Sequence, residues 1–447
     1  MHTPLSTPSV AAPVSLAVVA APPKARAAPV AGPWRLRMVL AAPHRLGFFL
    51  AMVVLVMASA WWLAVQLDRA TGALGLAPAV PATLTHAAVM VMGFMPLFFS
   101  GFLFTAGPKW LNVPAYEVRT LLPALGLQAL GWGLWLAGAH LPLGGQAVAL
   151  AGLVAAAAGL GWMYGLLWRL IAASRVADQV HARAVGVGGI VGTLCLAGMA
   201  LALLAGRVDV ALALVRTALW GCVVVTYVSV AHRMIPFFTS SALPMVEAWR
   251  PFWVLWLMLG VAAFEVLAVW VDFAAPGPRA WLGWTVAVIA VETVAGAVLL
   301  WLALVWGLVQ SLKIRLLAML HVGFVWLGLA LLVSAASQGL WLVGGQAWLG
   351  LGAVHALSMG FLGSLMLAMV TRVSCGHSGR SLVADDAVWV LFWALQGVVV
   401  LRLLAAVQGM PAWLTLLAAL GWAAVVTAWA LRYANWYGRP RIDGKPG

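Results

Sequence analysis

Acidic residues, and charge of either sign, are scarce in this chain. Of its 447 residues, 11 are Asp or Glu, 25 are Lys or Arg, and charged residues make up only 8%. With 65% hydrophobic residues, the chain has too little polar surface for a water-soluble domain. A net charge of +14 would suggest nucleic acid in a soluble protein, but in a membrane protein basic residues mark one side of the membrane. We therefore expect no nucleic-acid partner.

Cysteines are few, and the P-loop motif is missing. The three cysteines, Cys195, Cys222 and Cys375, show no paired or C-x-x-C spacing. This spacing argues against a disulfide framework, and the count excludes a site of four thiolates. The chain contains no G-x-x-x-x-G-K-[ST] loop, so the P-loop mode of nucleotide binding is excluded. Its chemistry must depend on other side chains.

Apolar residues are present in continuous runs of about twenty, the length of a membrane-spanning helix. Because the runs are continuous and not alternating, they predict helices and not the strands of a barrel. We predict an all-α integral membrane protein, a bundle of about twelve transmembrane helices. The expected spans are Leu46–Gln66, Ala82–Ala106, Val118–Ala139, Ala147–Ile171, Ala184–Ala205, Val210–Val230, Pro251–Asp272, Trp281–Val309, Leu316–Ala335, Ala347–Val370, Ala387–Ala406 and Pro411–Arg432.

The loop charges predict the orientation of the bundle. If the N-terminus is cytoplasmic, all but five of the 25 basic residues fall on the inner side, as the positive-inside rule requires. The five are Arg69, Arg207, Arg216, Arg279 and Arg402. We expect cytoplasmic N- and C-termini, a disordered tail over residues 1–33, a transmembrane domain over 34–435 and a basic tail over 436–447.

Two histidines are predicted at matching depth near the outer face. His86 lies about one turn into the second span and His355 about two turns into the tenth. Met90 and Met359 follow them at helical spacing, and glycines share the same stripes. Two imidazoles at one depth are suited to hold a haem iron, while His/Met ligation and copper are alternatives. The competing interpretation is that each histidine only bonds a backbone carbonyl and the glycines only pack helices.

A second group of histidines is expected near the inner face. His321 lies in the ninth span, while His232 and His377 lie at inner helix ends. They would form a second haem or copper site if their helices are neighbours, with Cys375 as a soft ligand. Glu265 and Glu292, near the middle of the seventh and eighth spans, indicate a proton path or else one internal hydrogen bond each.

Four segments in order resemble the NnrS family of haem- and copper-containing membrane proteins. They are HALSMGFLGSLMLAMVTRVSCGHSGR from His355 to Arg380, HVGFVWL from His321, GFLFTAGPKW from Gly101 and RMIPFFT from Arg233. The resemblance implies haem binding by His86 and His355, roles for His321 and His377 as ligands or pocket residues, and cofactor contact by Arg372 of the Met-Thr-Arg piece. Many members open the second helix with Trp-His-x-His-Glu, whereas this chain keeps only His86 there.

The resemblance implies a multi-pass protein of the bacterial inner membrane with a role in nitric oxide metabolism or nitrosative stress. We expect one or two haem b groups, with copper as a further cofactor. The partners would be the lipid bilayer, a redox partner or quinol, and a nitric oxide or nitrosyl ligand. If the protein is an enzyme, it would be a haem/copper oxidoreductase; a sensor or assembly factor without turnover is equally compatible. The alternative is a multi-pass transporter for a small solute or metal, whose path is lined by the histidines, Glu265 and Glu292.

Overall fold

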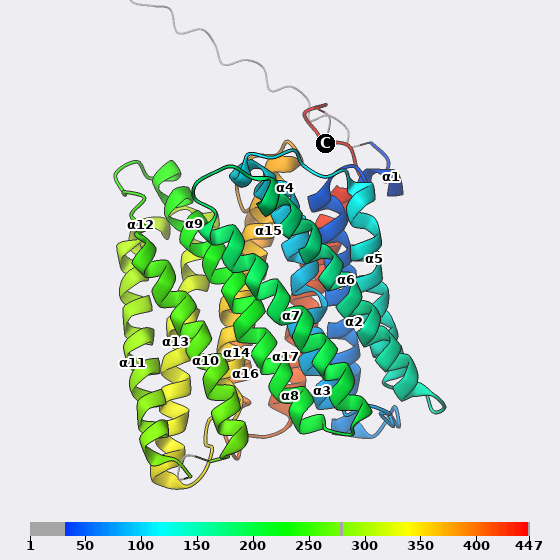
Figure 1. Ribbon diagram of the computed structural model, residues 1–447, viewed down its shortest axis with the longest axis vertical. Coiled ribbons are helices and arrows are strands. Elements are labelled where there is room, and N and C mark those ends of the chain that lie inside the picture. Colours follow the sequence, from blue (N-terminus) through cyan, green and yellow to red (C-terminus); the bar gives the residue numbers. More distant parts are fainter. Residues whose placement is uncertain (1–31, 278–279, 446–447) are drawn as a thin grey trace, which may run out of the picture.

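The computed structural model describes residues 32–277 and 280–445, and all regular secondary structure in these ranges is helical (Figure 1). Twelve helices there are long and apolar enough to span a membrane, which confirms the predicted all-α bundle. The cytoplasmic location of the termini stays a prediction, and residues 1–31 of the tail expected over 1–33 lie outside the described residues. The helices are α1 (Leu36–Val39), α2 (Pro43–Thr71), α3 (Ala82–Ala88), α4 (Met95–Leu111), α5 (Val118–Gly138), α6 (Gly145–Ala173), α7 (Val180–Leu204), α8 (Val208–Ala218), α9 (Val225–Ala242), α10 (Phe252–Ala274), α11 (Leu282–Val305), α12 (Leu308–Ser311), α13 (Arg315–Gly344), α14 (Gly352–His355), α15 (Ser364–His377), α16 (Asp386–Leu404) and α17 (Trp413–Tyr437).

Three of the spans change from α- to π-helical geometry part of the way along. Segment η1 (Val89–Gly93) joins α3 to α4, η2 (Leu219–Val224) joins α8 to α9, and η3 (Ala356–Gly363) joins α14 to α15. A π-turn adds one residue to a helical turn and re-aims the side chains around it, and such turns are frequent at functional sites. Segment η3 begins directly after His355, and η1 begins three residues after His86.

Several helices extend beyond the apolar runs that predicted them. The sixth span continues to Ala242 and the ninth to Gly344, because helical hydrogen bonding does not require apolar side chains outside the lipid. The tenth begins at Gly352 and not at the predicted Ala347. Gly350 has φ of +44°, a left-handed conformation that ends helical geometry and favours glycine.

Helices from the two ends of the chain lie side by side. α2 packs against α4, α5 and α17, α5 packs along α6, and α11 packs along α13. The backbone N–H of Arg35 donates to the carbonyl of Gly438 at 2.7 Å, so α1 and the last described residues share one end of the bundle (Figure 1). We name this end of the bundle the terminal end. The other end, where α3 and α14 begin, is named the opposite end.

Arg45 joins the first and last spans at the terminal end. Its side chain is buried, and Nη1 donates to the carbonyls of Met38 at 3.3 Å, Tyr437 at 3.1 Å and Arg439 at 2.8 Å. A cation at the C-terminus of α17 also stabilises the helix dipole. Arg45→Ala is expected to lower the melting temperature in detergent, because the free energy of unfolding should fall by roughly 2–3 kcal/mol. Exposed Arg37 provides the control, since Arg37→Ala should leave that temperature unchanged; equal effects would show that Arg45 does not hold the ends together.

Candidate functional site

One cavity near the opposite end contains both histidines of the predicted outer pair. We name it the histidine cavity; its volume is about 60 Å³, room for a metal ion and a small ligand. Residues from α2, α3, α14, α16 and α17 form its wall together with η1, η3 and Met95 of α4. The lining residues are Trp62, His86, Met90, Phe94, Met95, His355, Ser358, Met359, Arg402, Thr415, Ala418, Ala419 and Trp422.

The imidazole of His355 is oriented by its own helix. Its Nδ1 is 2.9 Å from the carbonyl oxygen of Leu351, one turn earlier in the chain. A carbonyl only accepts hydrogen bonds, so Nδ1 carries the proton and Nε2 keeps its lone pair. A backbone bond to one ring nitrogen is the usual way of aiming the other at a metal. The carbonyl bond therefore leaves His355 able to act as a ligand.

His86 has fewer partners than His355. Its Nδ1 is buried without a hydrogen-bond partner, which is costly for a polar atom inside a membrane protein. Its ring stacks on that of Trp62 with centroids 3.8 Å apart and an interplanar angle of 19°. Trp62 thus holds the imidazole in place and covers one of its faces. The unpartnered nitrogen fits a site that is completed by something other than protein.

Arg402 of α16 is a cavity residue to which the sequence had led us to assign no role. It lines the histidine cavity, its charge acts on both His86 and His355, and its Nη1 is buried without a partner. A guanidinium in this position suits an anionic group, since it offers several donors in a planar fork. The signal was present in the sequence: an arginine inside a predicted apolar span.

Sulfur atoms complete the donor set. Met90 and Met359 line the cavity as their spacing predicted, and Met95 joins them. The hydroxyl of Tyr227 donates to Sδ of Met95 at 3.2 Å. Imidazole and thioether together are suited to copper, particularly its reduced form, while imidazole alone also suits haem iron.

The glycines on the histidine stripes pack helices together. A Cβ on Gly101 would meet the ring of Phe48 at 2.5 Å, and one on Gly93 would meet Cγ1 of Val54 at 3.3 Å. A Cβ on Gly363 would meet the ring of Trp422 at 3.4 Å. These close contacts favour the interpretation that Gly93, Gly101 and Gly363 allow close approach of helices.

The predicted inner group is divided among three separate places. Nε2 of His321 is 2.9 Å from Oγ1 of Thr239, while Nδ1 of His232 is 2.9 Å from Nε2 of His181. The ring of His377 lies 4.4 Å from that of His44, centroid to centroid. Within residues 32–277 and 280–445, no three His, Cys, Asp or Glu side chains are arranged to hold a metal ion.

Two inner histidines had no predicted role, and the cofactor contact expected of Arg372 stays a prediction. His181 precedes the predicted span Ala184–Ala205, but the helix begins earlier and His181 is buried in the first turn of α7. His44 is buried in the first turn of α2. The guanidinium of Arg372 lies 3.9 Å from the ring centroid of Phe238. Depth in the membrane was readable from the sequence for these residues, but the neighbouring helix was not.

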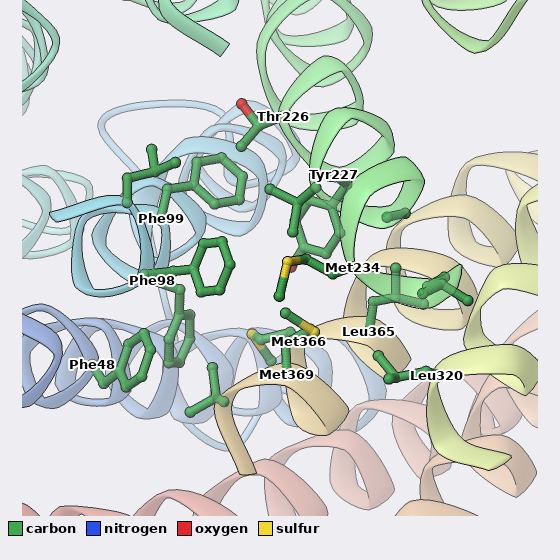
Figure 2. A pocket seen from close by; sticks show the side chains of 16 residues that line it. Phe48, Phe98, Phe99, Thr226, Tyr227, Met234, Leu320, Leu365, Met366 and Met369 are labelled. Atoms are coloured by element: carbon green, nitrogen blue, oxygen red, sulfur yellow. The ribbon is translucent and has the colours of Figure 1, made fainter. Parts of the chain in front are cut away.

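A second, apolar cavity lies between α2, α4, α9, α13 and α15 (Figure 2). Its volume is about 60 Å³, and the side chains of Met234, Met366 and Met369 converge on it from α9 and α15 (Figure 2). Apolar cavities of this kind stay dry and take up small apolar molecules. Tyr227 lines this cavity and bonds Met95 of the histidine cavity, so one side-chain pair connects the two.

Comparisons with known proteins identify one family. The family model described as NnrS protein matches residues 38–441, nearly the whole chain. No curated protein and no solved structure matches this chain.

Proposed function

Because this chain belongs to the NnrS family of multi-pass membrane proteins, we propose that it holds a redox-active metal group between His86 and His355 and acts on nitric oxide or nitrosyl species. Haem b is the first candidate for the group. Its location would be a bacterial inner membrane, with electrons supplied by a quinol or a protein partner. A sensor that binds nitric oxide without turnover would use the same site.

The observation that carries this proposal is the pairing of two distant histidines. His86 and His355 come from helices far apart in the chain and line a single cavity. The Leu351 carbonyl directs the lone pair of His355 Nε2 away from its own helix, and His86 keeps an unpartnered nitrogen. A metal bound there would supply one-electron chemistry, while the two imidazoles would fix its position.

The haem alternative is supported by Arg402 and by the apolar cavity. The unpartnered guanidinium offers a charge partner for a propionate group, which would otherwise be an unpaired anion in the membrane. Nitric oxide is small and weakly polar, so it partitions into lipid and into apolar cavities. The methionine-lined cavity would hold such a molecule next to Tyr227 and Met95. A macrocycle needs more room than about 60 Å³, so its binding requires Trp62 to leave the face of His86.

Copper is the second candidate, and the size of the cavity favours it. An ion fits the existing volume without displacement of Trp62. Met90, Met95 and Met359 add thioether sulfur to the two imidazoles, a donor set that suits reduced copper. Nitric oxide chemistry is accessible to copper as well as to iron, so the proposed activity does not depend on which metal is bound.

The test is the cofactor content of the purified full-length protein. After expression with added haem and copper, we expect about one metal group per chain, because one pair of histidines lines the cavity. Optical spectra and the pyridine haemochrome assay would identify haem, and mass-spectrometric metal analysis would identify copper. A colourless protein free of both metals would reject the proposal and favour the transporter alternative.

A further inference from the structure

We propose that Glu265 and Glu292 form a proton-binding site that exchanges its proton with water at the opposite end of the bundle. The two residues come from α10 and α11, near the middle of both helices. Their side chains are hydrogen-bonded to each other. A carboxylate only accepts hydrogen bonds, so a bond between two carboxyl groups requires a proton on one of them. The pair therefore holds one shared proton.

The surroundings of the pair enforce that shared proton. Glu265 is 8% exposed and Glu292 is 2% exposed, and two negative charges in contact at this depth would repel each other strongly. Ser334 of α13 bonds Glu292. Oε1 of Glu265 and Oε2 of Glu292 are buried without a partner, so whichever carboxyl group lacks the shared proton keeps an oxygen free to take one more.

A polar cavity connects the pair with the opposite end. Its volume is about 420 Å³, enough for a chain of water molecules. Both carboxyl groups line it, and so do Pro276 and Gly277 of the loop that follows α10. Glu265 is nine residues from Ala274, where α10 ends, a depth of about 14 Å at 1.5 Å per residue. The cavity spans this depth, which gives the carboxyl groups an aqueous route.

Few other charges face the pair. Asp272 lines the cavity two turns after Glu265 on α10 and accepts from Nε1 of Trp284 at 3.3 Å. Arg216 lines it from α8 and acts electrostatically on Asp272. The described lining residues of α13 and α14 are uncharged, with Ser334, Ser337 and Gln338 as the polar ones. Asp272 and Arg216 thus mark the entrance, and the carboxyl pair is the site that changes its proton occupancy.

Exchange transfers one proton between water in the cavity and the carboxyl pair. With one shared proton the pair carries a charge of minus one, and a hydronium ion in the cavity gives up a proton to a free carboxylate oxygen and becomes water. The pair is then neutral, and release is the reverse reaction. Nothing is oxidised or reduced. The inference does not rest on the proposed metal group, although Leu351 and Val354 of the His355 helix form part of the same cavity wall.

The first test is chemical labelling of the full-length protein in membrane vesicles. Dicyclohexylcarbodiimide adds to protonated carboxyl groups in apolar surroundings, and mass spectrometry locates the adduct. We expect labelling of Glu265 or Glu292 at neutral pH, loss of that labelling as the pH is raised, and no label on exposed Glu247. Absence of label at both positions, or protection by sodium ions at constant pH, would overturn the proposal.

The second test locates the aqueous route and needs no change to the carboxyl groups. Ser337 lines the cavity, whereas neighbouring Ala336 is exposed on the outside of the bundle. A membrane-impermeant maleimide should label Ser337→Cys only from the side opposite to a C-terminal tag, and should label Ala336→Cys poorly because it faces lipid. The three native cysteines are buried, which keeps the background low. Labelling of Ser337→Cys from the tag side would contradict the proposed route.

Discussion

Replacement of Gly131 by leucine is expected to abolish the folded protein or to lower its melting temperature more than any other single change considered. A Cβ at this position would lie 2.5 Å from the carbonyl oxygen of Gly152 and 2.6 Å from the backbone nitrogen of Ala156. Overpacking against side chains costs about 1–3 kcal/mol. Here the leucine side chain would meet the backbone of α6, which cannot move aside. We therefore expect the free energy of unfolding to fall by an amount at or above the upper end of that range. The melting temperature is measured by fluorescence-detected size-exclusion chromatography after heating.

The effect should be large because the contact repeats along the whole α5–α6 interface. Gly131 and Gly138 face α6, and Gly145, Gly152 and Gly159 face α5, with successive members of each set seven positions apart. A Cβ on Gly159 would lie 2.6 Å from the carbonyl oxygen of Ala124, which extends the same spacing along α5. Small residues at regular spacing let two membrane helices approach to backbone contact, so separating them at one position disturbs the others.

Gly133 supplies the matched control on the same helix. A Cβ there would meet nothing within 4 Å, so Gly133→Leu adds the same side chain without a clash. Its melting temperature should stay close to that of the unchanged protein. If both variants lose equal stability, the cost comes from replacing glycine in general and the proposed close packing is not its cause.

The comparison between α5–α6 and the histidines shows what sequence could and could not predict. The twelve spans and the depth of His86 and His355 follow from hydropathy and helical rise, which are local properties. The spacing of Gly145, Gly152 and Gly159 was also present in the sequence, but its meaning depends on α5 being the neighbouring helix. Neighbour order and rotation about the helix axis are tertiary properties.

The inner histidines illustrate the same limit. His232 was expected near His321 and His377 because all three lie toward one face of the membrane. The structure pairs His232 with His181 instead, and His321 with a threonine. Equal depth is compatible with many positions around a bundle of this size. Arg402 was overlooked for a related reason: it was counted as a loop charge, although it lies within an apolar span and lines the cavity.

His86→Ala and His355→Ala should each remove the bound metal group from the purified protein. Each substitution deletes one of the two imidazoles that line the histidine cavity, and a single remaining imidazole holds iron or copper weakly against wash-out by chelators. We expect metal content and optical absorption to fall to background in both variants. The measurement is metal analysis with absorption spectra on protein that elutes as a folded monodisperse peak, which separates loss of metal from loss of fold.

Two further variants extend this test. One is a control, and the other distinguishes haem from copper. His140→Ala should keep the metal, because His140 lies outside the cavity lining, where its Nε2 accepts from Trp61 at 2.8 Å. Arg402→Gln distinguishes the two candidate groups. A haem that depends on this guanidinium for its propionate would be lost or shifted in spectrum, whereas copper bound by imidazole and thioether would be retained. If His86→Ala or His355→Ala keeps full metal content, the two histidines do not share a metal, and the proposed centre must lie elsewhere in the bundle.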